Sequence, residues 1–180
     1  MNPNSSQRDS EVTNPRNAFT LIELLVVISV IAILASLAFP AVNGAMDTAR
    51  KARAKSDVSQ ITTAVAAYEV EYGRLPITNS TGSDVTDNVT TNLINILRGT
   101  DTNANPRKIV FLEVSEWKKG KGGTNSAGFC DPWDSNSVYK IAMDGNYDNQ
   151  ISAGNPATNL MKKVAVWSEN TNTNRRVTSW

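Results

Sequence analysis

The strongest constraint on the fold of this chain is a nearly continuous apolar segment that runs from Phe19 to Phe39. As a helix, these 21 residues span about 30 Å, which matches the hydrocarbon thickness of a bilayer. Apolar residues cover every face, which disfavours a core helix of a soluble protein. A cleaved secretory signal is also disfavoured, because the segment is too long and no small-residue cleavage site clearly follows it. The sequence therefore predicts a membrane-spanning helix.

The composition excludes most catalytic and metal-binding chemistry. The chain has no histidine, which excludes histidine-based triads and histidine-ligated zinc. Its single cysteine, Cys130, excludes an internal disulfide and cysteine-cluster metal sites, and no histidine is present to activate its thiol. The net charge of +1 leaves no excess of cations for binding nucleic acid. We therefore expect neither an enzyme nor a nucleic-acid-binding protein.

One carboxylate, Glu23, lies inside the apolar segment, four residues after Phe19. A charged side chain at the centre of a bilayer costs roughly 2.5–3.5 kcal/mol, and less near the interface. One interpretation is that Glu23 reaches the lipid headgroups. The other interpretation is that Glu23 pairs with a cation supplied by another chain.

The string AFTLIEL at residues 18–24, which opens the apolar segment, resembles the class III signal of type IV pilins and type II secretion pseudopilins. The resemblance implies that prepilin peptidase cuts between Ala18 and Phe19, removes residues 1–18 as a leader, and methylates the new amine of Phe19. It also implies that Glu23 pairs with the Phe19 amine of the neighbouring subunit during assembly. Ala18 replaces the glycine that the family usually has before the cut.

The resemblance also implies a location and a set of partners. The subunit is expected in the inner membrane as a single-pass protein, with its C-terminal body in the periplasm, and then in a periplasmic or surface filament. The implied partners are prepilin peptidase, the inner-membrane assembly platform, other copies of the chain and other pseudopilins. The basic residues count against this orientation, because two precede the segment and four follow it: Arg8 and Arg16, then Arg50, Lys51, Arg53 and Lys55.

After the segment at residues 19–40, residues 41–73 predict an amphipathic continuation of the same helix. Pro40 lacks an amide donor and is expected to bend the helix at the junction. Gly73 and Pro76 predict its end, and residues 68–76 resemble the end of the stem helix in major pseudopilins. Five apolar residues at alternating spacings of three and four lie on one face of this stem: Val58, Ile61, Val65, Tyr68 and Tyr72.

Residues 74–180 predict a body of mixed structure. The fold class expected for the chain is α+β, with a long N-terminal helix packed on a small antiparallel β-sheet with long loops. The sheet would bury the apolar face of the stem. The expected elements are an exposed connector at 77–91, a short helix at 92–98 closed by Gly99, strands at 109–114, 137–143 and 163–167, and a candidate fourth strand at 175–179.

Two loops of the body invite structural interpretations. Residues 130–134 and 138–139 resemble a signature of the major pseudopilins. From the residues themselves, Asp131 and Pro132 are expected to start a turn, and Trp133 is expected to fold back onto the sheet. A second loop combines three glycines with three lysines and lacks the spacing of a phosphate-binding P-loop, so it is interpreted as solvated surface: Lys118, Lys119 and Lys121.

A third loop places oxygen-bearing side chains at alternate positions, Asp144, Asn146 and Asp148, as in the first half of a calcium-binding loop. A complete EF-hand needs a glutamate eleven residues after Asp144, where Asn155 stands. The alternatives are a calcium-stabilised loop and a set of Asx turns without metal.

Two functions from different classes remain. The first is a structural subunit of a type II secretion pseudopilus or a type IV pilus-like filament. The second is an uncleaved, single-pass membrane-anchored module that binds a ligand through its loops rich in asparagine and threonine. A hydrolase on a signal anchor is disfavoured, because no acid–base pair or activated nucleophile is recognisable.

Overall fold

The computed structural model describes residues 19–79 and 81–180, which form two compact units, residues 19–43 and residues 44–180. The predicted leader, including Ala18, lies outside the described residues. Helix α1 (Leu21–Tyr72) contributes its first part to the first unit and its second part to the second. Pro40 lies inside α1 without ending it. Each unit has its own physical character.

In the first unit, α1 exposes apolar side chains on every face. No residue from 19 to 43 is buried, and Leu21 and Phe39 are 87% and 70% exposed. Among the described residues, α1 is also the one helix long and apolar enough to cross a membrane. Soluble proteins rarely expose so extensive an apolar surface, so lipid or other protein must cover it. This exposure fits a membrane-anchoring helix.

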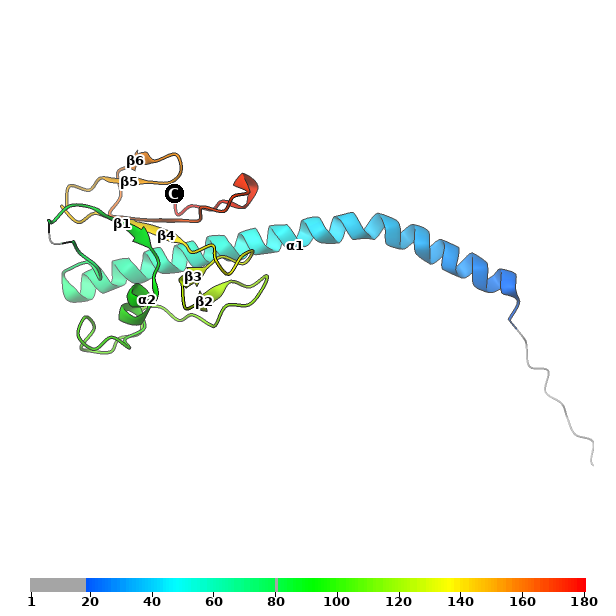
Figure 1. Ribbon diagram of the computed structural model, residues 1–180, viewed down its shortest axis with the longest axis horizontal. Coiled ribbons are helices and arrows are strands. Elements are labelled where there is room, and N and C mark those ends of the chain that lie inside the picture. Colours follow the sequence, from blue (N-terminus) through cyan, green and yellow to red (C-terminus); the bar gives the residue numbers. More distant parts are fainter. Residues whose placement is uncertain (1–18, 80) are drawn as a thin grey trace, which may run out of the picture. The chain divides into compact units, whose positions relative to one another are not determined.

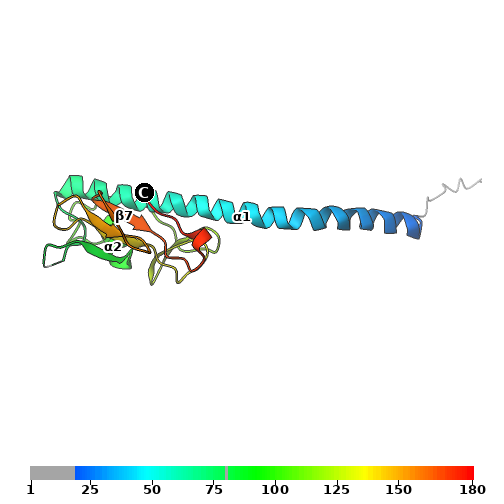
Figure 2. The ribbon, with the colours of Figure 1, turned by 90° about the horizontal axis from the view of Figure 1, so that it is seen from above.

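The second unit contains a three-stranded antiparallel sheet of β1 (Val85–Asn88), β4 (Lys140–Met143) and β7 (Val164–Trp167). Strand β4 is central, so that Ile141 lies opposite Asp87 on one side and Val166 on the other. A short helix, α2 (Thr91–Leu97), follows β1. Figures 1 and 2 show this sheet alongside the second part of α1.

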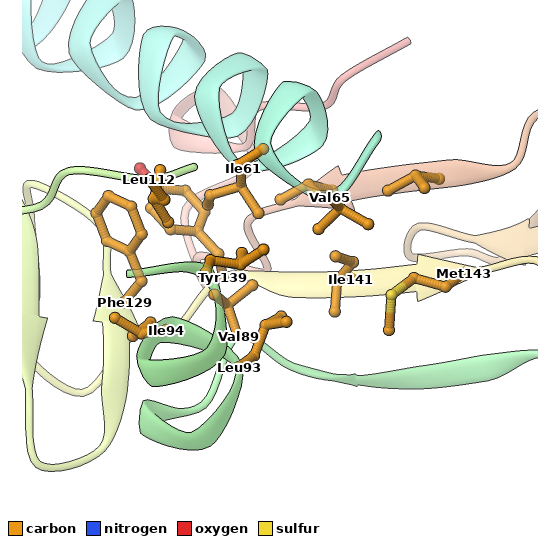
Figure 3. Close-up of a cluster of buried hydrophobic side chains, with 14 of the residues drawn as sticks. Ile61, Val65, Val89, Leu93, Ile94, Leu112, Phe129, Tyr139, Ile141 and Met143 are labelled. Atoms are coloured by element: carbon orange, nitrogen blue, oxygen red, sulfur yellow. The ribbon is translucent and has the colours of Figure 1, made fainter. Parts of the chain in front are cut away.

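The apolar face predicted for the stem is confirmed as the face that packs on the sheet. In Figure 3, Ile61 and Val65 of α1 point toward Tyr139 and Ile141, with Leu93 of α2 on the far side of the same core. Burying such side chains stabilises the fold by roughly 1.5–3 kcal/mol each. The buried residues of α1 fall at helical spacing along one face, singly or as adjacent pairs: Ala54, Asp57, Val58, Ile61, Ala64, Val65 and Tyr68.

The predicted ends of both helices are also confirmed. Gly73 has φ +66°, and its N–H donates to the Glu69 carbonyl at 2.8 Å, which closes α1. Gly99 has φ +74° after α2. A side chain at Gly99 would lie 2.7 Å from the carbonyl carbon of Lys108, so glycine is required there by conformation and by space.

The strand predictions need three corrections. Residues 77–91 are not simply a connector, because they contain the edge strand β1. Residues 109–114 form no strand, because the N–H groups of Phe111 and Leu112 donate to the Leu97 carbonyl at the end of α2. Of residues 175–179, Arg175 belongs to the 3₁₀ helix η1 (Thr173–Arg175), and only the following segment pairs with β7, through Thr178.

Two hairpins were not predicted from the sequence. The first joins β2 (Gly123–Asn125) to β3 (Gly128–Cys130), and the second joins β5 (Ile151–Ala153) to β6 (Thr158–Leu160). Their strands are only three residues long and largely polar or small, so they carry little alternating pattern.

Candidate assembly site

The predicted assembly residues lie at the start of α1, with Phe19 just before the helix and Glu23 in its first turn. Phe19 is 78% exposed, and with Ile22, Val26 and Val27 it lines a shallow apolar groove beside Glu23. The structure therefore places Phe19 and Glu23 together at the start of the apolar helix. Ala18, the residue before the predicted cleavage site, lies outside the described residues.

Glu23 also makes an interaction that the sequence analysis missed. The Thr20 N–H and hydroxyl donate to Glu23 Oε2 at 2.9 and 2.8 Å, and the Glu23 N–H donates back to Thr20 Oγ1 at 3.3 Å. This is a reciprocal capping box, in which the first turn of α1 satisfies its own polar groups. The signal was present in the sequence as threonine followed three residues later by glutamate. Glu23 thus has a partner within its own chain.

The turn that resembles the major pseudopilins is organised by a buried carboxylate. Asp131 is fully buried, and its Oδ1 accepts hydrogen bonds from the N–H groups of Trp133 and Asp134 at 2.9 and 3.0 Å. Its Oδ2 accepts from the Ser137 hydroxyl at 2.7 Å and the Asn170 side-chain amide at 3.2 Å. The predicted turn start at Asp131 is confirmed, and Asp131 also joins this turn to the loop after β7.

Trp133 makes a contact that the sequence analysis missed. Its side chain is half-buried against the hydrophobic core, and the indole Nε1 donates to Asp47 Oδ1 on α1 at 3.0 Å. Arg175 lies over the Trp133 ring and contacts Asp47 Oδ2 at 3.4 Å. The indole is drawn to the helix because Asp47 offers a charged acceptor at the rim of the core. Trp133 therefore attaches the turn to the stem.

A second buried carboxylate, Asp57, lies on the packed face of α1. Arg53 Nε lies 3.1 Å from Asp57 Oδ1, and the Tyr139 hydroxyl donates to Oδ2 at 3.3 Å. Oδ1 receives no well-directed hydrogen bond from the described residues, so the ion pair with the exposed Arg53 is its compensation. Burial raises the pKa of Asp57 to about 6, opposed by the charge of Arg53 and the hydrogen bond from Tyr139.

We predict that replacing Asp57 with asparagine flattens the pH dependence of stability between pH 5 and 7. A carboxyl whose pKa rises on folding stabilises the folded state at low pH, and this stability is lost as the pH rises through about 6. Between pH 5 and 7 the effect is about 1 kcal/mol, and no histidine titrates in the same range. Denaturant unfolding at both pH values measures it. Equal pH dependence in wild type and Asp57→Asn would contradict the assignment.

The structure places Asp144, Asn146 and Asp148 in one loop between β4 and β5. Both carboxylate oxygens of Asp144 accept backbone hydrogen bonds, from Asp148 at 3.1 Å and from Asn149 at 2.8 Å. Asp148 Oδ1 accepts from the Gln150 N–H at 2.8 Å. The Asp148 bond spans two residues and forms an Asx turn, whereas the two Asp144 bonds span four and five residues and close the loop. Within the described residues no group of three or more His, Cys, Asp or Glu side chains is arranged to hold a metal. Calcium binding stays a prediction.

The lysine loop lies at the surface, as expected, and Cys130 is enclosed within the body. Cys130 is fully buried, and burial raises the pKa of its thiol to about 11. Such a thiol remains protonated and unreactive at neutral pH. Lys118, Lys119 and Lys121 are exposed.

Comparisons with known proteins agree with this geometry. Residues 13–39 match the model of the prokaryotic N-terminal methylation motif, which covers the start of α1 and the predicted processing site. The chain is 30% identical over 116 residues to the type IV major alpha-pilin of Moraxella bovis, an alignment that covers 63% of this chain and 69% of that protein.

Two type II secretion proteins are also similar. The chain is 37% identical over 67 residues to the type II secretion system core protein G of Escherichia coli, covering 37% of this chain and 46% of that protein. It is 36% identical over 63 residues to core protein G of Klebsiella michiganensis, covering 35% and 44%. The chain thus spans slightly less than half the length of these two relatives. No solved structure matches.

A long apolar N-terminal helix, a small α+β body with an antiparallel sheet, and the methylation motif together define a protein of the pilin class. Because the chain is 30% identical to the Moraxella pilin over 69% of that protein, it belongs to the family of type IV pilins and type II secretion pseudopilins.

Proposed function

We propose that this chain is a structural subunit of a type II secretion pseudopilus or a type IV pilus-like filament. The observation that carries the proposal is the first unit: Phe19 and Glu23 open an apolar helix that no part of the chain's own described structure covers. In the membrane, lipid covers these side chains. Outside the membrane only other protein can do so, because exposed apolar surface of this extent drives association in water.

The proposed division of the chain follows from this role. Residues 1–18 are a leader that prepilin peptidase removes, with cleavage between Ala18 and Phe19 and methylation of the Phe19 amine. Residues 19–40 span the inner membrane and assemble, residues 41–73 form the stem, and residues 74–180 form a periplasmic body. The partners are the peptidase, the inner-membrane assembly platform, other copies of the chain and other pseudopilins.

Processing sets up the pairing between subunits. Cleavage creates a positively charged amine at the start of α1, and Glu23 of a neighbouring copy is the proposed counter-ion. In a medium of low dielectric such a charged hydrogen bond is stronger than in water. To make it, Glu23 must exchange or share its bonds to Thr20. The support for this step is the position of Glu23 at the exposed start of the helix.

Mass spectrometry of the native N-terminus tests the proposal. The filament subunit is expected to begin at Phe19 and to carry an added methyl group. A chain that begins at Met1 supports instead the alternative of an uncleaved, membrane-anchored binding module. Deleting the host's prepilin peptidase is the control, and it should leave the N-terminus at Met1.

Calcium binding by the loop after β4 is a separate prediction. If Asp144, Asn146 and Asp148 hold the ion, adding calcium raises the melting temperature of the wild-type body, because the ion binds the folded state alone. The double variant Asp144→Ala and Asp148→Ala should lose this rise. Magnesium at the same concentration controls for ionic strength. If calcium does not raise the melting temperature of the wild type, or raises that of the double variant equally, these three residues do not bind calcium.

A further inference from the structure

Basic residues gather at the end of the second unit where α1 enters it. Four of them lie on α1 within twelve residues of Gly44, and three lie on the loop before β2. The loop lies against the helix: a side chain at Gly120 would be 3.6 Å from Arg50 Nε. We call these seven residues the basic collar: Arg50, Lys51, Arg53, Lys55, Lys118, Lys119 and Lys121.

The acidic side chains next to the collar do not neutralise its lysines. Asp57 pairs with Arg53, and Asp47 is shared between Arg50, Arg175 and the Trp133 indole. Among the described residues, none of the five lysines of the collar makes an ion pair, and all five are exposed. The collar therefore presents unpaired positive charge to its surroundings.

The collar extends to both sides of the helix. Lys118, Lys119 and Lys121 lie on the side of Arg50, whereas Lys51 lies beside Trp133 and Arg175, and Lys55 lies beside the C-terminal residues 178–180. Charges spread in this way do not converge on a single small ligand. Lysines on flexible stems suit a diffuse array of anions.

The first residues of the collar on α1, Arg50 and Lys51, lie near the outer limit of the electrostatic reach of a membrane surface. Arg50 follows Pro40 by ten residues, which is about 15 Å along a helix. The headgroup region occupies about 5–8 Å on each side of the hydrocarbon, and the Debye length adds about 8 Å at physiological ionic strength. Anionic headgroups attract basic segments within this range.

We propose that the basic collar binds anionic phospholipid headgroups at the surface where α1 leaves the membrane, and so holds the body against the bilayer before assembly. The proposal rests on the membrane-anchored state in the proposed function. It also explains why four basic residues follow the apolar segment although they oppose a periplasmic body. The attraction is lost when the subunit leaves the bilayer.

The test uses the full unprocessed chain, one copy per nanodisc, so that no filament forms. Lysine acetylation is followed by mass spectrometry in discs of phosphatidylcholine alone and in discs with one third phosphatidylglycerol. Labelling at Lys118, Lys119 and Lys121 should slow at least about threefold in the anionic discs and recover at high salt. Lys108 and Lys162, exposed lysines near the other end of the stem, are internal references and should not change.

Charge reversal provides the matched variants. In the first variant Lys118, Lys119 and Lys121 are replaced with glutamate, and acetylation is read at Lys51 and Lys55, which are still present. The slowing of acetylation at these two lysines by anionic lipid should be abolished or strongly reduced. Reversing Arg98, Lys108 and Lys162, the same change of charge elsewhere on the body, should leave it intact.

Three outcomes overturn the proposal. The first is equal labelling of the collar in both discs. The second is equal protection by free glycerol phosphate, which would indicate a soluble anion site. The third is protection in neutral discs that grows with protein concentration, which would assign the collar to a second copy of the chain. Because single copies are measured, a failure here leaves filament assembly to its own test at the N-terminus.

Discussion

Replacing Glu23 with alanine or valine should leave membrane insertion intact and abolish incorporation into filaments. Insertion is unaffected because the change removes a charge from an otherwise apolar segment. Incorporation fails because the amine of Phe19 on the neighbouring subunit loses its counter-ion in a low-dielectric setting, where an unpaired charge is costly. Membrane fractionation measures insertion, and shearing of assembled filaments followed by immunoblotting measures incorporation. Filaments at wild-type levels from either variant would refute the pairing role.

The capping box provides the controls that separate two roles of Glu23. Glutamine at position 23 can still cap the helix with Thr20 but carries no charge. The Glu23→Gln variant should therefore lose incorporation to the same extent as Glu23→Ala. Thr20→Val removes the capping hydroxyl and retains the charge, so it should incorporate. The opposite pattern would show that Glu23 acts by capping α1 rather than by pairing with its neighbour.

Replacing Asp131 with alanine should destabilise the body by at least about 3 kcal/mol, because several buried or partly buried donors lose their acceptor together. The turn at residues 131–137 and the loop that contains Asn170 should both loosen. Denaturant unfolding of the detergent-solubilised chain, followed by tryptophan fluorescence, measures the loss of free energy.

Asp134 is the matched control for Asp131. It is exposed and accepts one hydrogen bond, from the Asn136 N–H at 2.9 Å, so Asp134→Ala should cost less than about 1 kcal/mol. Asp131→Asn should fall between the two, because an amide nitrogen in place of Oδ2 can accept from neither Ser137 nor Asn170. Equal stability of the two alanine variants would show that the buried Asp131 carboxylate does not stabilise the turn and the loop that contains Asn170.

The helical part of the fold could be predicted from the sequence because its pattern is regular and local. The apolar segment after Phe19 and the spacing from Val58 to Tyr68 predict which residues lipid or the sheet covers, and glycine marks each helix end. Strand β1 escaped prediction because its residues are mostly polar. Only Val85 of its four residues is buried, and pairing with β4, more than fifty residues away, makes it a strand.

The polar interactions at the sites were harder to predict. The capping of Glu23 by Thr20 was readable in principle, since both residues lie in one helical turn. The partners of Asp57 and Asp131 were not, because Tyr139 and Asn170 approach them from distant parts of the chain. A carboxylate in a sequence does not reveal its burial, and only the packed fold determines which donors surround it.

The enclosure of Cys130 has a practical value for mapping how these subunits meet. Because this is the chain's single cysteine, and its thiol is both shielded and held protonated, the natural sequence already serves as a silent background for thiol-directed probes. A cysteine introduced at the exposed turn residue Ser126 could carry a spin label or a crosslinker without removal of the native one. Distances between neighbouring subunits could then be measured on an otherwise unaltered body.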